Sequence, residues 1–416
     1  MPSPAEIVAR VLARRHRFPG WVNRAIDGVV DHPPTFLLRW LSPASRSAAP
    51  GEIPAPPQVP ENQAERVVIG PVNYSGQGLL WARALQRARP QNWSYDFAIE
   101  VPGGFAFDTD TEVPLHVHAS SRAWQDAQLA AIERCTHVLV EAERPLLGRR
   151  FADFEAEARE LRARGLSVAF LAHGTDIRVP SLHVPTTHWS VFQDTDAYWG
   201  RQETLATRNL AALRRLGGPF FVSTPDLKYF LPEAEWCPVV VDPEKWAGES
   251  VAGDREVPVV AHVPSQAKTK GTDLVEPVLF ALQEEGLIEY RPVRGVPSAR
   301  MPEVYGAADI VLDQFRLGSY GVTACEAMSS GRVVLGHVSP EVREWVRSAT
   351  GEELPIVEAD PDTVETELRA LLADRAEMRR IGAAGAEFVR AVHDGRMSAA
   401  VLGAHWLDVE GSGRGA

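Results

Sequence analysis

The sequence predicts an α/β protein built from two doubly wound, Rossmann-like domains. The chain has 416 residues, enough for two domains of roughly 150 residues each. From Arg66 onward, short apolar runs alternate with stretches of helical length, which is the pattern of parallel strands joined by crossover helices. This alternation occurs twice, and a proline-containing connector separates the two series, so two parallel sheets are expected.

The first series begins with an apolar strand, which leads through a turn at 71–78 into a helix at 79–89. Its expected strands lie at 67–69, 95–101, 137–140, 167–171 and 220–223. After the connector, the second series is expected to have strands at 258–262, 288–293, 309–313, 333–336 and 354–357. Helices are expected to close the chain from Pro361 to about Trp406.

These patterns predict five segments. Two domains are expected at 61–235 and 257–395, joined by a hinge connector at 236–256. A helical extension with a Pro-rich linker at 1–60 precedes them, and a C-terminal helix and tail at 396–416 follows. The extension begins with several arginines and contains two helical patterns around Pro19 and Gly20. We expect it to pack on the body of the protein. The alternative is a peripheral membrane contact through residues 1–40, since basic amphipathic helices can lie on a membrane surface.

The composition excludes several functional classes. A net charge of −12 argues against nucleic acid as a main partner, because phosphate backbones require clustered cations. No apolar run approaches the length of about 18 residues that a transmembrane helix needs, and the start of the chain lacks the apolar core of a signal peptide. The three cysteines are scattered and lack metal-binding spacing, so a reduced, cytoplasmic protein is expected.

A glycine-rich loop follows the strand expected at 309–313 and opens a short helix that carries Glu326. A strand, loop and helix of this kind direct backbone N–H groups and the helix dipole at one point, which suits a phosphate. Glu326 lies one turn inside the helix, where its carboxylate could accept hydrogen bonds from a diol such as ribose. The alternative is an ordinary βα unit with a surface glutamate.

A second polar loop, at 262–273, follows the first strand of the second series. Its side chains Ser265, Lys268 and Lys270 can donate hydrogen bonds to a pyrophosphate, and Gly271 lets the next helix approach closely. The chain has only four lysines against 39 arginines, so a pair of lysines two residues apart favours a binding role. The spacing is not that of a P-loop, which argues against hydrolysis of a nucleoside triphosphate. A solvated basic loop is the alternative.

Two loops of the first domain also end predicted strands, where ligands bind in open parallel sheets. The loop at 70–78 is rich in glycine and polar residues but has no suitable acidic residue after the second strand, so a dinucleotide site is not indicated. The loop at 173–178 carries His173, Asp176 and Arg178. Asp176 and Arg178 could pair with each other or hold a substrate.

The segment 318–331 resembles the donor motif of retaining glycosyltransferases of the family 4 type (glycosyl transferases group 1). That motif reads roughly Glu-Gly-Phe-Gly-x-x-x-x-Glu-Ala-Met-x-x-Gly, and this chain matches it at Gly321, Glu326, Ala327, Met328 and Gly331. The first glutamate is absent, and Gly318 holds its place. The resemblance covers most of 66–395. It implies a GT-B fold with two facing Rossmann-like domains, the nucleotide on the second and the acceptor on the first.

The resemblance also implies roles for individual residues. Lys270, immediately before a glycine, matches the family's diphosphate-binding lysine, although Pro264 stands where an arginine is often found and Lys268 would supply the second cation. His173 matches a histidine that meets the transferred sugar. The implied catalytic residues are His173, Lys270 and Glu326. The implied substrate-binding residues are Asn73, Ser75, Gly76, Ser265, Lys268, Arg294, Ser319, Tyr320, Gly321 and Val322. Asp313 or Gln314 could replace the absent glutamate.

The implied reaction transfers a sugar from a UDP- or GDP-sugar to a carbohydrate, lipid-linked or small-molecule acceptor, with retention of anomeric configuration. No cofactor is expected, and no metal, because the acidic triplets Asp108–Asp110 and Asp194–Asp196 lie away from the four loops. Lysines and helix dipoles would neutralise the leaving diphosphate instead. Two alternatives are a degenerate, non-catalytic protein that binds nucleotide sugars and a sugar phosphorylase or epimerase on the same fold.

Overall fold

The computed structural model describes residues 53–100, 107–193, 197–248, 250–264 and 266–409. Most of the extension expected at 1–60 lies outside these ranges, including residues 1–40 and their expected membrane contact. Ser265 and the acidic triplet Asp194–Asp196 also lie outside the described residues.

The first half of the chain forms a seven-stranded sheet with the order β3-β2-β1-β4-β5-β6-β7. Its strands are β1 (Glu65–Gly70), β2 (Asn92–Glu100), β3 (Thr111–Pro114), β4 (His137–Glu141), β5 (Ser167–Ala172), β6 (Phe220–Val222) and β7 (Glu235–Trp236). Pairing from β3 through β5 is parallel, and Val68 lies between Tyr95 of β2 and Val138 of β4. The strands are added on both sides of β1, so the sheet is doubly wound.

The second half forms a five-stranded parallel sheet with the order β12-β11-β10-β8-β9. Its strands are β8 (Val259–His262), β9 (Glu289–Pro292), β10 (Ile310–Leu312), β11 (Val333–Gly336) and β12 (Ile356–Glu358). Strands are again added on both sides of the first strand, here β8. The predicted fold class, two Rossmann-like parallel sheets with crossover helices, is confirmed.

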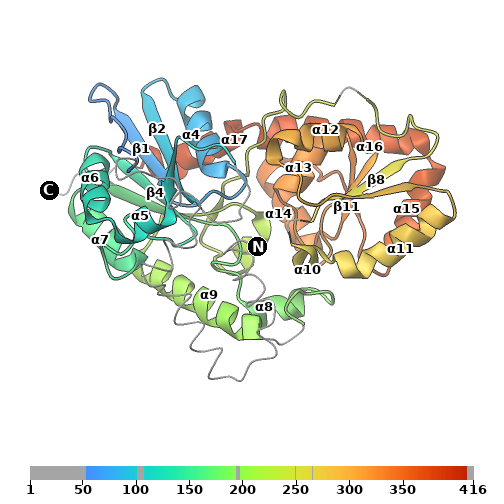
Figure 1. Cartoon of the computed structure of the whole chain (residues 1–416), viewed down its shortest axis with the longest axis horizontal. Helices are drawn as coiled ribbons and strands as arrows, with labels where there is room; N and C mark the ends of the chain where they lie inside the picture. Colours follow the sequence, from blue (N-terminus) through green and yellow to red (C-terminus); the bar gives the residue numbers. More distant parts are fainter. Residues whose placement is uncertain (1–52, 101–106, 194–196, 249, 265, 410–416) are drawn as a thin grey trace, which may run out of the picture. The chain divides into compact units, whose positions relative to one another are not determined.

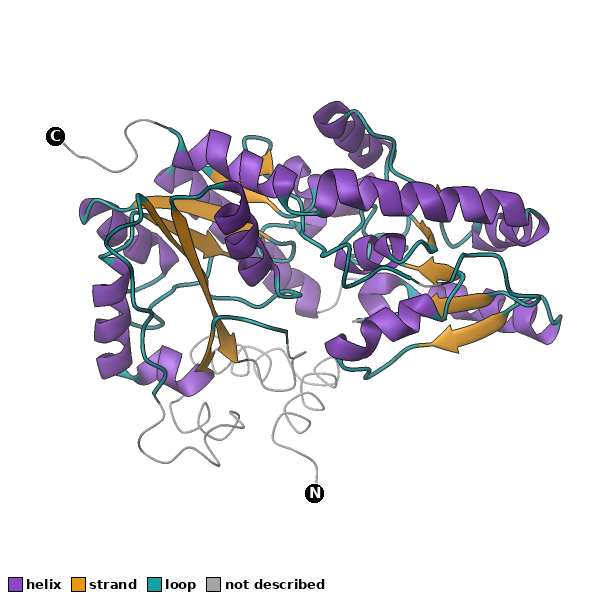
Figure 2. Cartoon of the chain, turned by 90° about the horizontal axis from the view of Figure 1, so that it is seen from above, coloured by secondary structure: helices purple, strands orange, loops and turns teal. Residues whose placement is uncertain are grey.

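Helices flank both sheets (Figures 1 and 2). Those of the first half are α4 (Gln77–Ala88), α5 (Leu115–Ser120), α6 (Arg122–Ile132), α7 (Phe154–Ala163), α8 (Pro180–His183) and α9 (Ala197–Leu216). Those of the second half are α10 (Ala267–Lys270), α11 (Thr272–Glu284), α12 (Met301–Gly306), α13 (Val322–Ser329), α14 (Pro340–Thr350), α15 (Val364–Ala373), α16 (Arg375–Phe388) and α17 (Arg396–Leu402). Short 3₁₀ turns are η3 (Val184–Thr186), η4 (Pro225–Tyr229) and η5 (Ser298–Arg300), and π turns are η6 (Val389–His393) and η7 (Gly403–Leu407).

Short polar side chains begin several of these helices. Ser121, Asp153, Ser339 and Asp374 each accept a hydrogen bond from a backbone N–H in the first turn of the helix that follows. Such caps satisfy donors that have no partner within the helix. Within the described residues, no helix is long and apolar enough to cross a membrane.

The described chain folds into two compact units that are each made of separate stretches of sequence. The first unit contains the residues up to Ile177, 195–221 and those from Gly403 onward, and the second contains 178–194 and 222–402. In the second unit, Val260, Ile310 and Val333 of the central strands pack with residues of α11, α15 and α16 in one buried apolar core.

Two strands were not expected from the sequence. β3 has only Val113 as a fully buried apolar residue, so it lacks an apolar run, and β7 is two residues long. Both extend the first sheet at its edges. They lie outside the repeated pattern of apolar run and helix from which the other strands were predicted.

Trp406, in η7, completes the first unit from the far end of the chain. Its side chain is fully buried, its indole N–H donates to the Ser167 hydroxyl oxygen at 2.9 Å, and its ring meets the His137 ring edge-on at a centroid distance of 5.2 Å. The C-terminal turn is therefore part of the core of the first unit.

We expect Trp406→Ala to lower the free energy of unfolding of the first unit by about 3–5 kcal/mol, because it leaves a large cavity. Trp406→Phe should cost less, since the ring is largely kept while the hydrogen bond to Ser167 is lost. Urea unfolding followed by near-UV circular dichroism measures both effects. An exposed residue of the same unit serves as a control, and Gln91→Ala should change stability by no more than about 0.5 kcal/mol. Equal stability of Trp406→Ala and the wild type would contradict this assignment.

Candidate functional site

The strand orders place one candidate half-site on each unit. In open parallel sheets, ligands bind beyond the carboxyl ends of the strands where the strand order reverses, because the adjacent loops diverge there. That point lies between β1 and β4 in the first sheet and between β8 and β10 in the second. The four polar loops singled out in the sequence leave β1, β5, β8 and β10, so they lie at or beside these two points.

In the loop after β1, the predicted residues shape the backbone. The Asn73 amide donates to the carbonyl oxygen of Phe107 at 2.9 Å, and its oxygen accepts the Gly76 N–H at 3.0 Å. Ser75 and Gly76 both have left-handed backbones, with φ of 58° and 70°, and Gly76 precedes the first residue of α4. Both ends of the Asn73 side chain are therefore used within the loop.

His173 follows β5 and is held by a buried carboxylate. Its Nε2 lies 3.0 Å from Glu141 Oε1, and the two side chains are 8% and 0% exposed. The imidazole packs against the rings of Tyr74 and Trp81, at centroid distances of 4.9 and 5.6 Å. Three elements, β4, β5 and α4 with its preceding loop, therefore converge on this one imidazole.

The remaining predicted residues of this loop do not pair with each other. The Asp176 carboxylate accepts the backbone N–H groups of His173 and Gly174, at 2.7 and 2.5 Å, and so fixes the turn. Arg178 instead forms a buried ion pair with Asp226, at 2.5 Å, within the second unit. Of the two roles considered for these residues, pairing with each other does not occur, because their side chains have different partners.

Sequence reasoning missed Glu141. It is the last residue of β4, directly after the apolar residues 138–140, and its pKa is raised by burial, although the hydrogen bond with His173 works in the opposite direction. A lone carboxylate at the carboxyl end of a buried strand was the available signal, since ionisable groups rarely end such a strand without a partner.

In the second unit, Lys270 and Asp313 form an ion pair across the point where the strand order reverses. Their side chains are 14% and 2% exposed, and the second carboxylate oxygen of Asp313, Oδ2, has no hydrogen-bond partner among the described residues. The Phe315 N–H donates to the Lys270 carbonyl oxygen at 3.1 Å, which ties the two loops together. Lys268 is exposed on α10, two residues away.

The side chains of the glycine-rich loop after β10 are turned into the protein. The Gln314 amide donates to the carbonyl oxygens of Ser319 and His337, and its oxygen accepts the N–H groups of Arg316 and Leu317. Gln314 is thus fully engaged and does not replace the absent glutamate. The Ser319 hydroxyl donates to Asp226 at 2.6 Å, and the buried Tyr320 hydroxyl meets His393 Nε2 at 3.2 Å.

This arrangement leaves backbone groups of the loop, rather than its side chains, for a ligand. Gly321 is extended and precedes α13, and Val322 is the first residue of that helix. The N–H groups of the first helical turn have no partner within the helix and concentrate its positive dipole.

Glu326 lies one turn inside α13 and is half-buried. Its Oε2 accepts a hydrogen bond from the Tyr305 hydroxyl at 3.2 Å. Burial raises the pKa of Glu326 to about 8, although the Tyr305 hydrogen bond and the charges of Lys245 and Lys270 lower it. A ligand that hydrogen-bonds the carboxylate would favour its ionised form.

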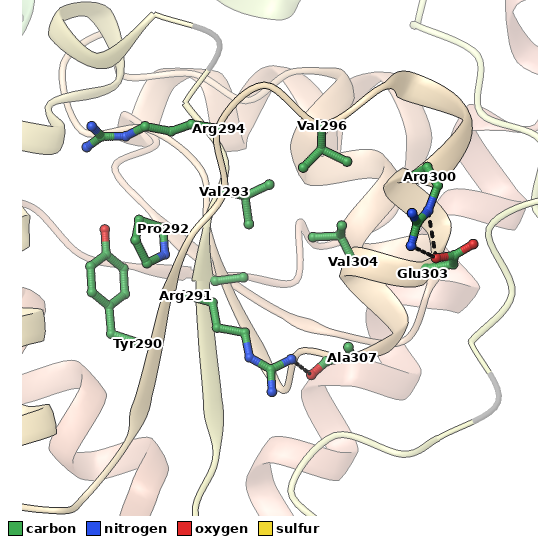
Figure 3. A pocket seen from close by; sticks show the side chains of 11 residues that line it. Tyr290, Arg291, Pro292, Val293, Arg294, Val296, Arg300, Glu303, Val304 and Ala307 are labelled. Atoms are coloured by element: carbon green, nitrogen blue, oxygen red, sulfur yellow. Dashed lines mark hydrogen bonds and ion pairs between the residues drawn. The ribbon is translucent and has the colours of Figure 1, made fainter.

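A cavity of about 540 Å³ lies beside the carboxyl end of β9 (Figure 3). Val293, Val296 and Val304 give it apolar walls, and arginines lie around it. Arg294 pairs with Glu276 at 3.0 Å, Arg300 pairs with Glu303 at 2.6 Å, and the Arg291 guanidinium donates to the Ala307 carbonyl oxygen. The cavity suits a flat, largely apolar group with polar edges.

The structure gives a reason for glycine at position 318. Its φ is 67°, in the left-handed region that glycine adopts more readily than other residues. The position is buried, and an added Cβ would lie 3.5 Å from Ser339 Cβ and 3.7 Å from His337 Nε2. His337 is itself held by Glu358 at 2.7 Å. A glutamate here would need both a strained backbone and space that His337 and Ser339 limit.

Among the described residues, no group of three or more His, Cys, Asp or Glu side chains is arranged to hold a metal ion. In the triplet Asp108–Asp110, Asp110 pairs with Arg83 and accepts the Asp96 N–H at 3.1 Å. That carboxylate therefore has partners within the protein.

Comparison with known proteins identifies the fold of the chain. Residues 280–402, less than half of the chain, match the model of a family described as glycosyl transferase-like. Comparison with curated proteins gives no match. Among solved structures, sucrose-phosphate synthase from Thermosynechococcus elongatus is similar with a TM-score of 0.53 and 14% identity, over 82% of this chain and 98% of that one.

Two further solved structures are similar over nearly the same span. The Anabaena protein HepE in complex with UDP and glucose gives a TM-score of 0.52 and 11% identity, over 83% of this chain and 100% of that one. A trehalose-6-phosphate synthase gives 0.51 and 12% identity, over 83% and 99%. The chain therefore has the GT-B fold, with two Rossmann-like domains.

We expect Gly318→Ala to destabilise the second unit by about 1–2 kcal/mol, because alanine must adopt a left-handed backbone there. Gly321→Ala is the matched control in the same loop. Its φ is −141°, and an added Cβ would meet nothing within 4 Å, so its stability should stay near that of the wild type. Urea unfolding of the two variants measures the difference, and equal stabilities would show that the left-handed turn is not required.

Proposed function

We propose that this protein is a glycosyltransferase that moves a sugar from a nucleotide diphosphate-sugar, a UDP- or GDP-sugar, to an acceptor with retention of anomeric configuration. The acceptor would be a carbohydrate, a lipid-linked sugar or a small metabolite. One observation carries the proposal: Lys270, the first turn of α13 and Glu326 come from the loops at the strand reversal of the second sheet. A cation, backbone amides and a carboxylate are the groups that a diphosphate linked to a ribose requires.

Similarity to known proteins also supports the proposal. The match to the glycosyl transferase-like family spans 280–402, which includes α13 and Glu326. HepE, which shares the fold, has been solved in complex with UDP and glucose. The motif at 318–331 is similar to that of retaining family 4 enzymes, which is the basis for proposing retention.

In this proposal, Lys270 contacts the diphosphate, assisted by Lys268 and Ser265. The N–H groups at the start of α13, from Ser319 to Val322, contact a phosphate or the sugar, and Glu326 accepts hydrogen bonds from the ribose hydroxyls. The cavity next to Arg294 would take the nucleobase, since its valine walls suit a flat ring and backbone groups of the 293–296 loop lie at its edge.

Catalysis would rest on charge stabilisation rather than on a protein nucleophile. Negative charge grows on the diphosphate as the bond to the sugar breaks, and Lys270 with the helix dipole of α13 stabilises that charge without a metal ion. The departing phosphate would accept the proton of the acceptor hydroxyl on the same face of the sugar. On the first unit, His173 would contact sugar hydroxyls, with Asn73, Ser75 and Gly76 shaping the neighbouring loop.

A screen of UDP, GDP and their glucose, mannose and N-acetylglucosamine derivatives by thermal shift tests the donor class, because a bound ligand raises stability by mass action. We expect Lys270→Met to weaken donor binding by about 1.5–3 kcal/mol, the loss of a charge-assisted hydrogen bond. Lys228→Met, a lysine substitution on η4 of the same unit, should leave the affinity unchanged.

Lys270→Met also leaves the buried Asp313 carboxylate without its partner, so the double variant with Asp313→Asn separates loss of binding from loss of stability. Donor affinity that stays at the wild-type value in the double variant would place the diphosphate elsewhere. Failure of every nucleotide to shift the melting temperature would overturn the proposed function.

The affinity for UDP-glucose should rise with pH up to about 8 and then level off. The pKa of Glu326 is raised to about 8 in the free protein, so at pH 6 to 7 the Glu326 side chain is protonated in most of the molecules. Ribose hydroxyls donate to the ionised form, so binding must release a proton below pH 8. Calorimetry in buffers of different ionisation enthalpy measures that proton. Glu326→Gln should bind more weakly and release none, and an unchanged proton release would refute the ribose assignment.

A further inference from the structure

The His173–Glu141 pair on the first unit is backed by a second buried carboxyl group. A Cβ built on Gly78, the second residue of α4, would lie 2.3 Å from Asp96 Oδ1 and 3.2 Å from Glu141 Oε2. Both oxygens therefore point at the same α-carbon. Asp96 Oδ1 has no hydrogen-bond partner among the described residues, and both side chains are almost completely buried. Burial raises the pKa of Asp96 well above its usual value, and the Glu141 charge raises it further.

Two more carboxyl groups lie beside this pair. Asp176 accepts the His173 N–H, and Glu143 is buried next to Asp176, whose charge helps burial to raise the pKa of Glu143. Ala142 and Glu143 have φ of 54° and 51°, which costs non-glycine residues about 1–2 kcal/mol each. Strained backbone of this kind tends to occur at functional sites. Acidic residues from β2 and from the carboxyl ends of β4 and β5 are thus gathered near the His173–Glu141 pair.

The hydrogen bond to Glu141 decides which nitrogen of His173 faces a ligand as an acceptor. An ionised Glu141 has no proton to give, so with that carboxylate Nε2 carries the proton of the neutral imidazole and donates it to Glu141 Oε1. Nδ1 then presents a lone pair. Within the described part of the chain, Nδ1 has no hydrogen-bond partner, and the rings of Tyr74 and Trp81 pack against the imidazole. The His173 side chain is 8% exposed, and Nδ1 is not among the fully buried polar atoms that lack a partner.

We propose that Glu141 determines substrate specificity on the first unit: by fixing the His173 proton on Nε2, it makes Nδ1 an acceptor that selects a hydroxyl or ammonium group and rejects a carboxylate or phosphate. This rests on the proposed function in taking the ligand to be a sugar. A lone pair on Nδ1 repels an anionic oxygen, and such an oxygen has no proton to donate to it. The selected class is neutral or amino sugars, and the rejected class is uronic acids and sugar phosphates at this position.

The group that meets His173 can belong to the donor sugar or to the acceptor, so the test has two arms. In the first, calorimetry compares UDP-glucose with UDP-glucuronate. In the second, saturation-transfer NMR compares glucose, glucosamine and glucuronate as ligands of the UDP-bound protein. We expect the wild type to favour the neutral or amino form by about tenfold or more in at least one arm. Equal binding of neutral and anionic forms in both arms would overturn the proposal.

Glu141→Gln tests the residue itself. The amide N–H₂ can donate to Nε2, which moves the imidazole proton to Nδ1 and turns Nδ1 into a donor. We expect the preference for the neutral form to fall to threefold or less, about a third of the wild-type ratio, whereas a purely structural glutamate would weaken both ligands alike. Glu157→Gln is the matched control. Glu157 is also buried in the first unit, where it accepts the Leu146 and Leu147 N–H groups at 2.6 and 3.0 Å, and its loss should leave the ratio unchanged.

The tautomer of His173 can also be measured in the wild-type protein, so this test does not depend on whether a variant folds. The ¹⁵N chemical shifts of His173 in the wild-type protein at neutral pH report which nitrogen is protonated. The Nε2–H tautomer is expected, and either the Nδ1–H tautomer or an imidazolium ion would refute the assignment. Binding of UDP alone is measured in the same experiments. Loss of UDP binding would count against the proposed function, while the tautomer and the ratio test the role of Glu141.

Discussion

The ion pair between Lys270 and Asp313 fixes the geometry of the second unit where its strand order reverses. Two loops leave β8 and β10 in diverging directions at this point, and without a link their ends would be free to separate. The pair joins their side chains, and the hydrogen bond from the Phe315 N–H to the Lys270 carbonyl joins their backbones. Gln314 then organises the glycine-rich loop, which sets where α13 begins. The position of Glu326 depends on each of these steps.

The first unit uses the same topological feature with the opposite charge. Its strand ends gather carboxyl groups around an imidazole, whereas the second unit gathers a lysine and a helix N-terminus. An anionic diphosphate is compatible only with the latter, and hydroxyl groups that donate hydrogen bonds are compatible with the former. The backbone arrangement is similar in both sheets. The difference in charge between the two half-sites therefore comes from the side chains at and after the strand ends.

The sequence predicted the two sheets and the loops of the candidate site, because strand ends follow from where apolar runs stop. It could not predict which way side chains turn within those loops. Ser319 and Tyr320 were predicted to bind the donor, yet both side chains form hydrogen bonds inside the protein. Pairing of Asp176 with Arg178 was one of two possibilities, but Arg178 pairs with a residue 48 positions further on. Glu141 belongs to no motif; its place at the end of an apolar strand was the one sequence signal, and its contact with His173 is visible only in the structure.

Because η7 completes the first unit, the core of that unit remains unfinished until Trp406 has been synthesised. Trp406 lies 239 residues beyond Ser167, the residue to which it donates a hydrogen bond. At about 5–20 residues per second, a ribosome takes roughly 10–50 s to make that stretch. Throughout that time the first sheet exposes the apolar surface that Trp406 later covers. Apolar surface that is exposed during synthesis favours aggregation, so the late position of Trp406 lengthens the period in which the nascent first unit is vulnerable.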